Sequence, residues 1–173
     1  MFADKTRRIV RCDYDKSSCL IEGVAVTPTI TTNGKSFNPA GCELSVPIPL
    51  LFEHETQIGP IGEVVYMRKS ETEIFIRATL WPDECGYAAW ELIKIGELTG
   101  LSIGIGYGRG QFHIIEDDSV DYFTRFKMSE VSVCFHPSNP DCRFRIYPGG
   151  AQKMIHPSIV KARETIARLN RRR

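Results

Sequence analysis

The sequence lacks the features that define several large classes of protein. No run of about 18 apolar residues occurs among its 173 residues, so no segment is predicted to span a membrane. The N-terminal stretch "MFADKTRRIV" lacks the apolar core of a signal peptide, and we therefore expect a cytoplasmic protein. Neither sign of charge dominates, with 22 Lys and Arg against 21 Asp and Glu and a formal net charge of +1. That balance argues against a protein that binds nucleic acid through general attraction to phosphates.

Motifs for metals and cofactors are missing as well. The six cysteines form no Cys-x-x-Cys pair, which gives little support to a zinc or redox site and predicts ordinary reduced thiols. "HETQI", beginning at His54, is not a His-Glu-x-x-His zinc helix, because Ile58 stands where the second histidine would be. "GIGYGRG", beginning at Gly104, lacks the Lys-Ser/Thr pair of a phosphate-binding loop. We therefore predict no metal and no cofactor.

Short segments rich in β-branched and aromatic residues make up most of the chain. Alternation is clearest in "EIFIRATL" (73–80), where every second residue from Ile74 to Leu80 is apolar, and residues 70–72 are predicted to close a hairpin with 62–69. Segment 31–45 holds the turn signals Asn33-Gly34 and Asn38-Pro39 and is predicted to be a polar connection. Further strands are predicted at 19–26, 46–54, 101–108, 111–117, 121–128, 129–135 and 142–147.

One internal helix is predicted at 83–97, with Asp83 as its N-cap and Gly96 near its end. Strict β-α-β alternation is absent, which argues against a doubly wound sheet. The pattern predicts a mainly β (α+β) fold: a small antiparallel barrel or curled sheet with one internal helix and flanking helices. We expect residues 1–147 to form this domain. Residues 148–173 are expected to form a linker and a basic amphipathic helix or tail, with six Lys and Arg in 161–173.

A serine lies in an unusual setting in "GLSIGIG" (100–106). A buried strand favours Val and Ile over glycine, so the glycines around Ser102 need a reason. Glycine leaves backbone N–H groups uncovered and allows a substrate carbonyl to approach closely. Ser102 is also predicted at the start of a strand just after the helix, where a side chain can be presented at the rim of a sheet. Serine hydrolysis would further require a histidine base and a third group that holds the imidazole.

Three segments in order resemble one known family. They are "PLLFEHETQIGPIGEV" (49–64), "LIKIGELTGLSIGIGY" (92–107) and "MSEVSVCFHPSNPDCRF" (128–144). Together they resemble the prohead (capsid-maturation) serine proteases of tailed bacteriophages, and the histidine block paired with Gly-Leu-Ser-Ile-Gly is the most specific part. The chain departs from the family pattern in two places. Ser138 replaces the Ala of the usual Pro-Ala-Asn-Pro, and His136 stands where the family has an ordinary residue.

The resemblance implies a fold and a set of catalytic residues. The fold is a β-barrel like that of the herpesvirus assembly protease. Matched position by position, His54 is the base, Ser102 is the nucleophile, and Glu130 before "VSV" is our choice for the third member. The related herpesvirus enzymes use a second histidine in that role, so His136 or His113 remains an alternative. The candidate oxyanion donors are backbone N–H groups near Ile103, Gly104 and Arg143.

The resemblance also implies substrates and a location. A serine endopeptidase of this family would cleave the major capsid protein and the scaffold inside the procapsid, in the host cytoplasm, through an acyl-enzyme. Neither nucleic acid nor a membrane is expected as a partner, and a homo-oligomer is left open. Segment 156–173 would be a solvated helix, a targeting signal or an autocleavage segment. Two rival hypotheses remain: an inactive scaffold-binding capsid protein with the same fold, and a nucleic-acid-binding barrel that uses the Arg-rich tail.

Overall fold

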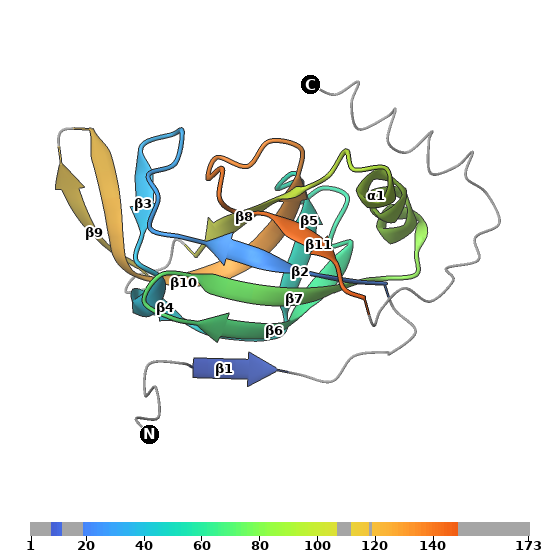
Figure 1. Cartoon of the computed structure of the whole chain (residues 1–173), viewed down its shortest axis with the longest axis horizontal. Helices are drawn as coiled ribbons and strands as arrows, with labels where there is room; N and C mark the ends of the chain where they lie inside the picture. The colour runs from blue at the N-terminus through green and yellow to red at the C-terminus, as the bar shows by residue number, and fades with distance from the viewer. Residues whose placement is uncertain (1–7, 12–18, 107–111, 118, 149–173) are drawn as a thin grey trace.

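The computed structural model describes residues 8–11, 19–106, 112–117 and 119–148, which form a curled sheet with a helix beside it (Figure 1). The sheet follows the order β11-β2-β7-β6-β5-β10-β3, and β1, β4, β8 and β9 attach to it as branches. This mainly β architecture with one helix confirms the predicted fold class. The elements are β1 (Arg8–Arg11), β2 (Cys19–Val26), β3 (Lys35–Phe37), the 3-10 helix η1 (Pro39–Gly41), β4 (Cys42–Glu43), β5 (Ile48–Phe52), β6 (Gly62–Lys69), β7 (Ile74–Leu80), α1 (Glu84–Lys94), β8 (Gly100–Ile105), β9 (Phe112–Asp117), β10 (Val120–Cys134) and β11 (Phe144–Ile146).

Strand β10 organises the sheet, because it pairs with five other strands along its length. Its first part pairs with β9 and β3, its middle with β4, and its last part with β5 and β8. We predicted two strands here, 121–128 and 129–135, and that division is wrong. The ladder with β8 shifts register between Met128 and Glu130 without ending the strand. No glycine or proline interrupts this segment, so one continuous strand can pair with several other strands along its length.

Three of the pairs made by β10 are parallel, namely those with β3, β4 and β5. The sequence predicted antiparallel pairing, which holds for the other ladders of the described residues. A parallel pair requires a long crossover, and β5 reaches β10 only after β6, β7, α1, β8 and β9. The consequence is that β5 and β10 end on the same side of the sheet. Residues that follow β5 therefore lie beside the end of β10.

Segment 31–45 differs from the polar connection that we predicted, since it contains β3, η1 and β4. These elements are too short and too polar to show a strand period. They are held by pairing with β10 and by local contacts such as Ser36 Oγ, which donates to the carbonyl of Pro28 at 2.8 Å. The predicted turn signals are confirmed: Gly34 has a φ of +75°, and the Asn38 side chain accepts from the N–H of Ala40 at the start of η1.

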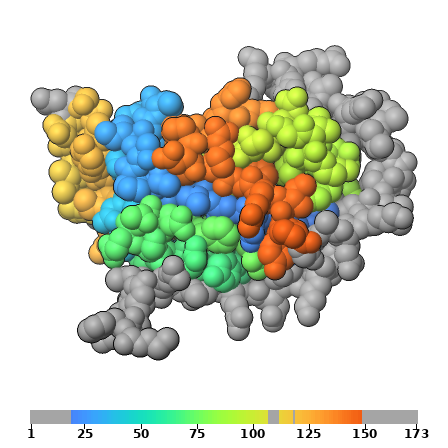
Figure 2. All heavy atoms as spheres, in the orientation of Figure 1, coloured from blue at the N-terminus to red at the C-terminus, as the bar shows by residue number. Residues whose placement is uncertain are grey.

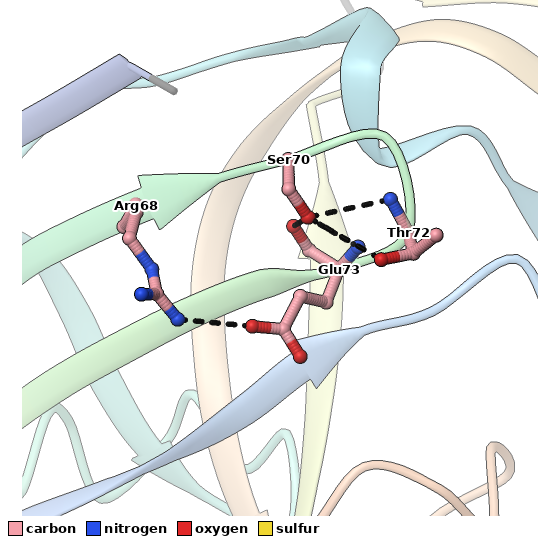
Figure 3. A network of polar contacts seen from close by, with 4 residues as sticks. All are labelled: Arg68, Ser70, Thr72 and Glu73. Carbon is pink, nitrogen blue, oxygen red and sulfur yellow. Dashed lines mark hydrogen bonds and ion pairs between the residues drawn. The ribbon is translucent and has the colours of Figure 1, made fainter. Parts of the chain in front are cut away.

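The hairpin between β6 and β7 closes where the sequence predicted it. Ser70 Oγ accepts from the backbone N–H groups of Thr72 and Glu73 at 3.3 and 3.2 Å, and Arg68 forms an ion pair of 3.0 Å with Glu73 (Figure 3). Beyond this turn, the alternate apolar residues from Ile74 to Leu80 are all fully buried. The predicted alternation of β7 is therefore confirmed, and its inner face forms part of the core.

Helix α1 begins and ends close to its predicted boundaries. The Asp83 side chain accepts from the N–H of Gly86 at 2.8 Å, which confirms the N-cap. The helix ends at Lys94, and Gly96 follows with a φ of +77°, so the predicted range of 83–97 was a few residues too long. Trp90 and Ile93 are buried against the sheet. β8, which carries Ser102, is the next element after this helix, as expected.

The cysteines that the structure describes are free thiols, and four of the five are buried. Burial raises the pKa of Cys42, Cys134 and Cys142 to about 12. Within the described ranges, no group of three or more His, Cys, Asp and Glu residues is arranged to hold a metal ion. In the same part of the chain, no helix is long and apolar enough to cross a membrane. The predicted C-terminal helix at 156–173 lies outside the described residues.

Candidate active site

His54 lies in a tight turn directly after β5. Its backbone φ is +60° and that of Glu53 is +49°, both in the left-handed region that residues other than glycine seldom adopt. The predicted extended segment 46–54 is therefore wrong at its last two residues, although β5 confirms its middle. Strain of this kind persists only where surrounding contacts maintain it, and it is frequent at functional sites.

Three hydrogen bonds hold this turn against the end of β10. The N–H of Glu53 donates to the carbonyl of Val133 at 3.0 Å, and the N–H of His54 donates to Ser132 Oγ at 3.0 Å. The Glu53 carboxylate accepts from the N–H of Phe135 at 2.6 Å. These contacts are available because β5 and β10 run parallel and end together. They fix the backbone from which the His54 ring projects.

Ser102 lies on β8, antiparallel to the last part of β10. Its Oγ is 2.8 Å from His54 Nε2, a distance suited to proton transfer between a nucleophile and its base. In the ladder, Ser102 is the partner of Ser132 and Gly104 is the partner of Glu130. Cross-strand partners share a face of the sheet, and so do residues two apart. These four positions therefore form one patch beside the His54 ring.

Glu130 contacts the other nitrogen of the same ring. Its Oε1 is 2.7 Å from His54 Nδ1, and its side chain is only 12% exposed, against 46% for His54. The hydrogen bond to Glu130 raises the pKa of His54 above its ordinary value, while partial burial opposes the rise and the negative charges of Glu130 and Glu53 add to it. A carboxylate only accepts, so Nδ1 carries the proton and Nε2 is left to accept from Ser102.

Ser132 is a residue of this site that the sequence reasoning missed. It is fully buried, its Oγ donates to Glu130 Oε2 at 2.8 Å, and the same oxygen accepts from the N–H of His54. One hydroxyl thus contacts both the histidine backbone and the carboxylate. The sequence does contain a signal for Ser132. It lies two residues after Glu130 in "SEVSV", and residues two apart in a strand lie on the same face.

The packing of β8 gives two of its glycines a reason that the sequence did not predict. A Cβ on Gly104 would lie 2.3 Å from Glu130 Oε1, and a Cβ on Gly100 would lie 2.4 Å from the ring of Pro137. The side of Gly104 on which a Cβ would stand is filled by the Glu130 side chain that contacts His54. The glycine is needed because the two strands are neighbours and the carboxylate lies across β8.

The two alternative histidines lie elsewhere. His113 is on β9, where its Nδ1 is 2.7 Å from Thr124 Oγ1. His136 follows the end of β10 and is exposed. Neither is joined to His54, whose Nδ1 is already bonded to Glu130. The structure therefore brings together His54, Ser102 and Glu130, and it leaves His113 and His136 apart.

The three candidate oxyanion donors fall into two groups. Ile103 and Gly104 follow Ser102 on β8, and both line the groove onto which Ser102 opens. Arg143 forms an antiparallel bridge with Gly100, and its guanidinium donates to Thr99 Oγ1 at 3.0 Å. Its neighbour Cys142 lines the groove, whereas Arg143 itself does not.

His54, Ser102 and Glu130 open onto a groove of about 400 Å³. This volume is within the usual range for ligand sites. The run from Leu101 to Ile105 on β8 forms one part of its lining, together with Glu130 and Ser129 of β10. The rest is contributed by the end of β2, by β3 with its preceding loop, by β5 with the turn that follows it, and by the segment after β10: Ala25, Val26, Thr31, Asn33, Lys35, Phe37, Leu51, His54, Thr56, Ser138, Asn139 and Cys142.

A serine and a carboxylate that share one histidine are typical of hydrolases, and comparison with known proteins identifies the family. The family model of the caudovirus prohead serine proteases matches residues 26–156. The chain belongs to this family. The match includes each member of the Ser102–His54–Glu130 arrangement and confirms the resemblance found in the sequence.

Individual relatives of this chain are more distant. A capsid polyprotein of Pseudomonas phage PAJU2 is 28% identical over 134 residues, which are 73% of this chain and 20% of that protein. The chain therefore spans about a fifth of the length of that relative. Among solved structures, the KSHV protease in complex with a hexapeptide phosphonate inhibitor is similar with a TM-score of 0.51, over 90% of this chain and 78% of that chain, at 12% identity. This likeness shows that the chain shares its fold with the KSHV protease.

Proposed function

We propose that this prohead protease is an active serine endopeptidase, with Ser102 as nucleophile, His54 as general base and Glu130 as the third member. The observation that carries the proposal is the unbroken chain of contacts from Ser102 Oγ to His54 Nε2 and from His54 Nδ1 to Glu130 Oε1, at 2.8 and 2.7 Å. The base is thus within hydrogen-bond reach of both the nucleophile and the orienting group, as acyl transfer requires.

In the first half of the reaction, Ser102 Oγ attacks the carbonyl carbon of the scissile peptide bond while His54 Nε2 takes its proton. Glu130 keeps the ring oriented and stabilises the imidazolium that forms. The negative oxygen of the tetrahedral intermediate would be bound by backbone N–H groups near Ile103, Gly104 and Arg143. His54 then gives its proton to the departing amine, the C–N bond breaks, and the acyl group stays on Ser102.

In the second half, water replaces the amine. His54 takes a proton from the water as it attacks the ester carbonyl, and then returns a proton to Ser102 Oγ as the C–O bond breaks. The carboxylic acid product leaves, and the resting state of the site is restored. Every proton that is transferred goes to His54 or to a leaving group, so these residues suffice for the whole cycle.

We propose the scaffold and the major capsid protein as substrates, cleaved inside the procapsid in the host cytoplasm, and the basic segment 156–173 as a site of self-cleavage. Family membership supports capsid proteins as substrates, and one relative is named a capsid polyprotein. A groove of about 400 Å³ beside Ser102 suits an extended peptide, and the related KSHV protease is known in complex with a hexapeptide phosphonate. Proteases often bind such peptides by strand addition.

The test is co-expression with the cognate scaffold and capsid proteins. We expect the wild type to shorten one or both of them and Ser102→Ala to leave both intact. Ser45→Ala is a matched control, because this serine lies between β4 and β5 and is not part of the groove. Cleavage by Ser102→Ala would overturn the nucleophile assignment.

A second measurement separates an active enzyme from an inactive scaffold-binding protein. A fluorophosphonate reacts with a serine only where a base activates it. We expect it to modify Ser102 of the wild type, identified by mass spectrometry, and to modify His54→Ala much more slowly. Intact substrates together with an unlabelled Ser102 would favour the inactive, scaffold-binding hypothesis.

A further inference from the structure

The groove beside Ser102 continues past the reacting residues. Five consecutive residues of β8, from Leu101 to Ile105, line it. At about 3.3 Å per residue, this run spans roughly 13 Å, enough for several residues of an extended peptide. β3 and the loop before it line the same groove. A substrate held there therefore lies within reach of side chains that play no part in bond cleavage.

The two opposite charges that line this groove, apart from His54, are not paired with each other. Besides His54, its charged side chains are Glu130 and Lys35. Glu130 is already occupied, with Oε1 against His54 and Oε2 accepting from Ser132. Lys35 forms no ion pair with any residue in the described part of the chain, although Asp121 is its neighbour in the ladder between β3 and β10. The groove thus carries one positive charge without an ion-pair partner.

Asn33 lies near Lys35 in the same lining. Its Oδ1 is 2.6 Å from Thr31 Oγ1, an arrangement that leaves the side-chain NH₂ to donate elsewhere. No protein acceptor for that NH₂ is found among the residues that the structure describes. An ammonium and an amide NH₂ are both pure donors, and together they match the two acceptor oxygens of a carboxylate.

The loop that carries these donors is held in place. The N–H of Thr31 donates to the carbonyl of Lys35 at 2.7 Å, and the N–H of Lys35 donates to Thr31 Oγ1 at 2.9 Å. The N–H of Thr32 donates to the carbonyl of Ser138 at 2.8 Å, which joins the loop to the segment after β10. Figure 2 shows the two segments, in blue and orange, side by side on the surface. A fixed loop binds with less loss of entropy than a mobile one.

We propose that Lys35 and Asn33 form a subsite for a carboxylate side chain of the substrate, so that cleaved sequences carry Asp or Glu at one fixed distance from the scissile bond. The proposal rests on the proposed protease function and adds a substrate class to it. An acidic residue at that position should raise kcat/KM on the order of tenfold over Gln or Asn, through charge-assisted hydrogen bonds.

The experiment is cleavage-site profiling with the purified 173-residue protein and a peptide library made from a digested bacterial proteome. New termini are identified by mass spectrometry and aligned on the scissile bond. We expect the wild type to show enrichment of Asp and Glu at one position, Lys35→Gln to lose it, and Lys35→Glu to prefer Lys and Arg there. Lys94→Gln is the control, because Lys94 is paired with Glu91 on α1, away from the groove.

The outcomes separate the subsite from the protease itself. A wild-type profile without acidic enrichment overturns the subsite and leaves the protease assignment standing. An enrichment that survives in Lys35→Gln also overturns it. If the wild type cuts nothing and a fluorophosphonate does not label Ser102, the proposed function fails and the subsite with it. The wild-type profile is decisive by itself, so a variant that does not fold does not leave the proposal untested.

Discussion

Glu130 Oε1 lies 2.7 Å from His54 Nδ1, although 76 residues separate the two in the chain. This contact holds the imidazole with Nε2 toward Ser102. It also gives a nearby negative charge to the imidazolium that would form during the reaction. Five predictions follow from this arrangement and from its surroundings.

Replacement of Glu130 by Gln should reduce kcat much more than it changes KM. The amide keeps the size of the side chain but lacks the charge that orients His54 and stabilises its protonated form, so kcat should fall by roughly 10²–10⁴-fold. Steady-state kinetics on a cleaved peptide measures both constants. His136→Ala is the matched comparison, because His136 is exposed and outside the groove. A large loss in His136→Ala with little loss in Glu130→Gln would reverse the assignment of the third member.

The pH dependence of kcat/KM should report the contact between Glu130 and His54. His54 must be neutral to act as a base, so kcat/KM rises as the pH increases through its pKa. Glu130 raises the pKa of His54 above the ordinary 6.5, which places the acid limb of the wild-type profile above that pH. Glu130→Gln removes the charged acceptor, and the limb should move to lower pH in whatever activity remains. A shift of the limb to higher pH would contradict the contact.

Ser132→Ala should impair the reaction while the fold is kept. The change removes the hydroxyl that donates to Glu130 Oε2 and accepts from the N–H of His54. Loss of a buried hydrogen bond to a charged group costs about 1.5–3 kcal/mol, so we expect kcat to fall on the order of tenfold or more with KM little changed.

The control for Ser132 is a double-mutant cycle with Glu130→Gln, measured on the same peptide. If Ser132 acts through Glu130, its removal should have little further effect once the carboxylate is gone. Equal losses in both backgrounds would show a purely structural role. Circular dichroism of each variant checks that the sheet has formed.

Gly104→Ala should displace Glu130. The added methyl would lie 2.3 Å from Oε1 and 2.8 Å from Cγ of that side chain, and overpacking of this kind typically costs about 1–3 kcal/mol. We expect lower kcat in a folded protein. The loss should be absent when Gly104→Ala is made in a Glu130→Ala background, where the space is empty. An equal loss in that background would mean that the methyl group acts on something other than Glu130.

Thiol reagents should leave the enzyme active. Four of the described cysteines are buried, and burial raises the pKa of Cys42, Cys134 and Cys142 to about 12, so thiolate is scarce at neutral pH. Native protein treated with iodoacetamide should keep its activity, and mass spectrometry should find these three residues unmodified. The sharpest check is Cys142, which lines the groove. Alkylation of Cys142 in the native protein would contradict its burial and its raised pKa.

Much of this protein could be predicted from local sequence. The alternation in 73–80, the turn at 70–72 and the cap at Asp83 depend on neighbours within a few residues, and each is confirmed. Segments 31–45 and 121–135 were predicted less well. Their structure depends on which distant strands pair with them, and local pattern does not contain that information.

The candidate site, too, could be predicted only in part from the sequence. Residue types and their order along the chain singled out Ser102, His54 and Glu130, because serine hydrolysis needs these groups and the family carries them in this order. The tertiary structure decided how they meet. A parallel pair of β5 and β10 places the His54 turn beside Ser132, and an antiparallel pair of β10 and β8 places Glu130 over Gly104. Those contacts are fixed by backbone hydrogen bonds between strands far apart in sequence, and only the folded chain forms them.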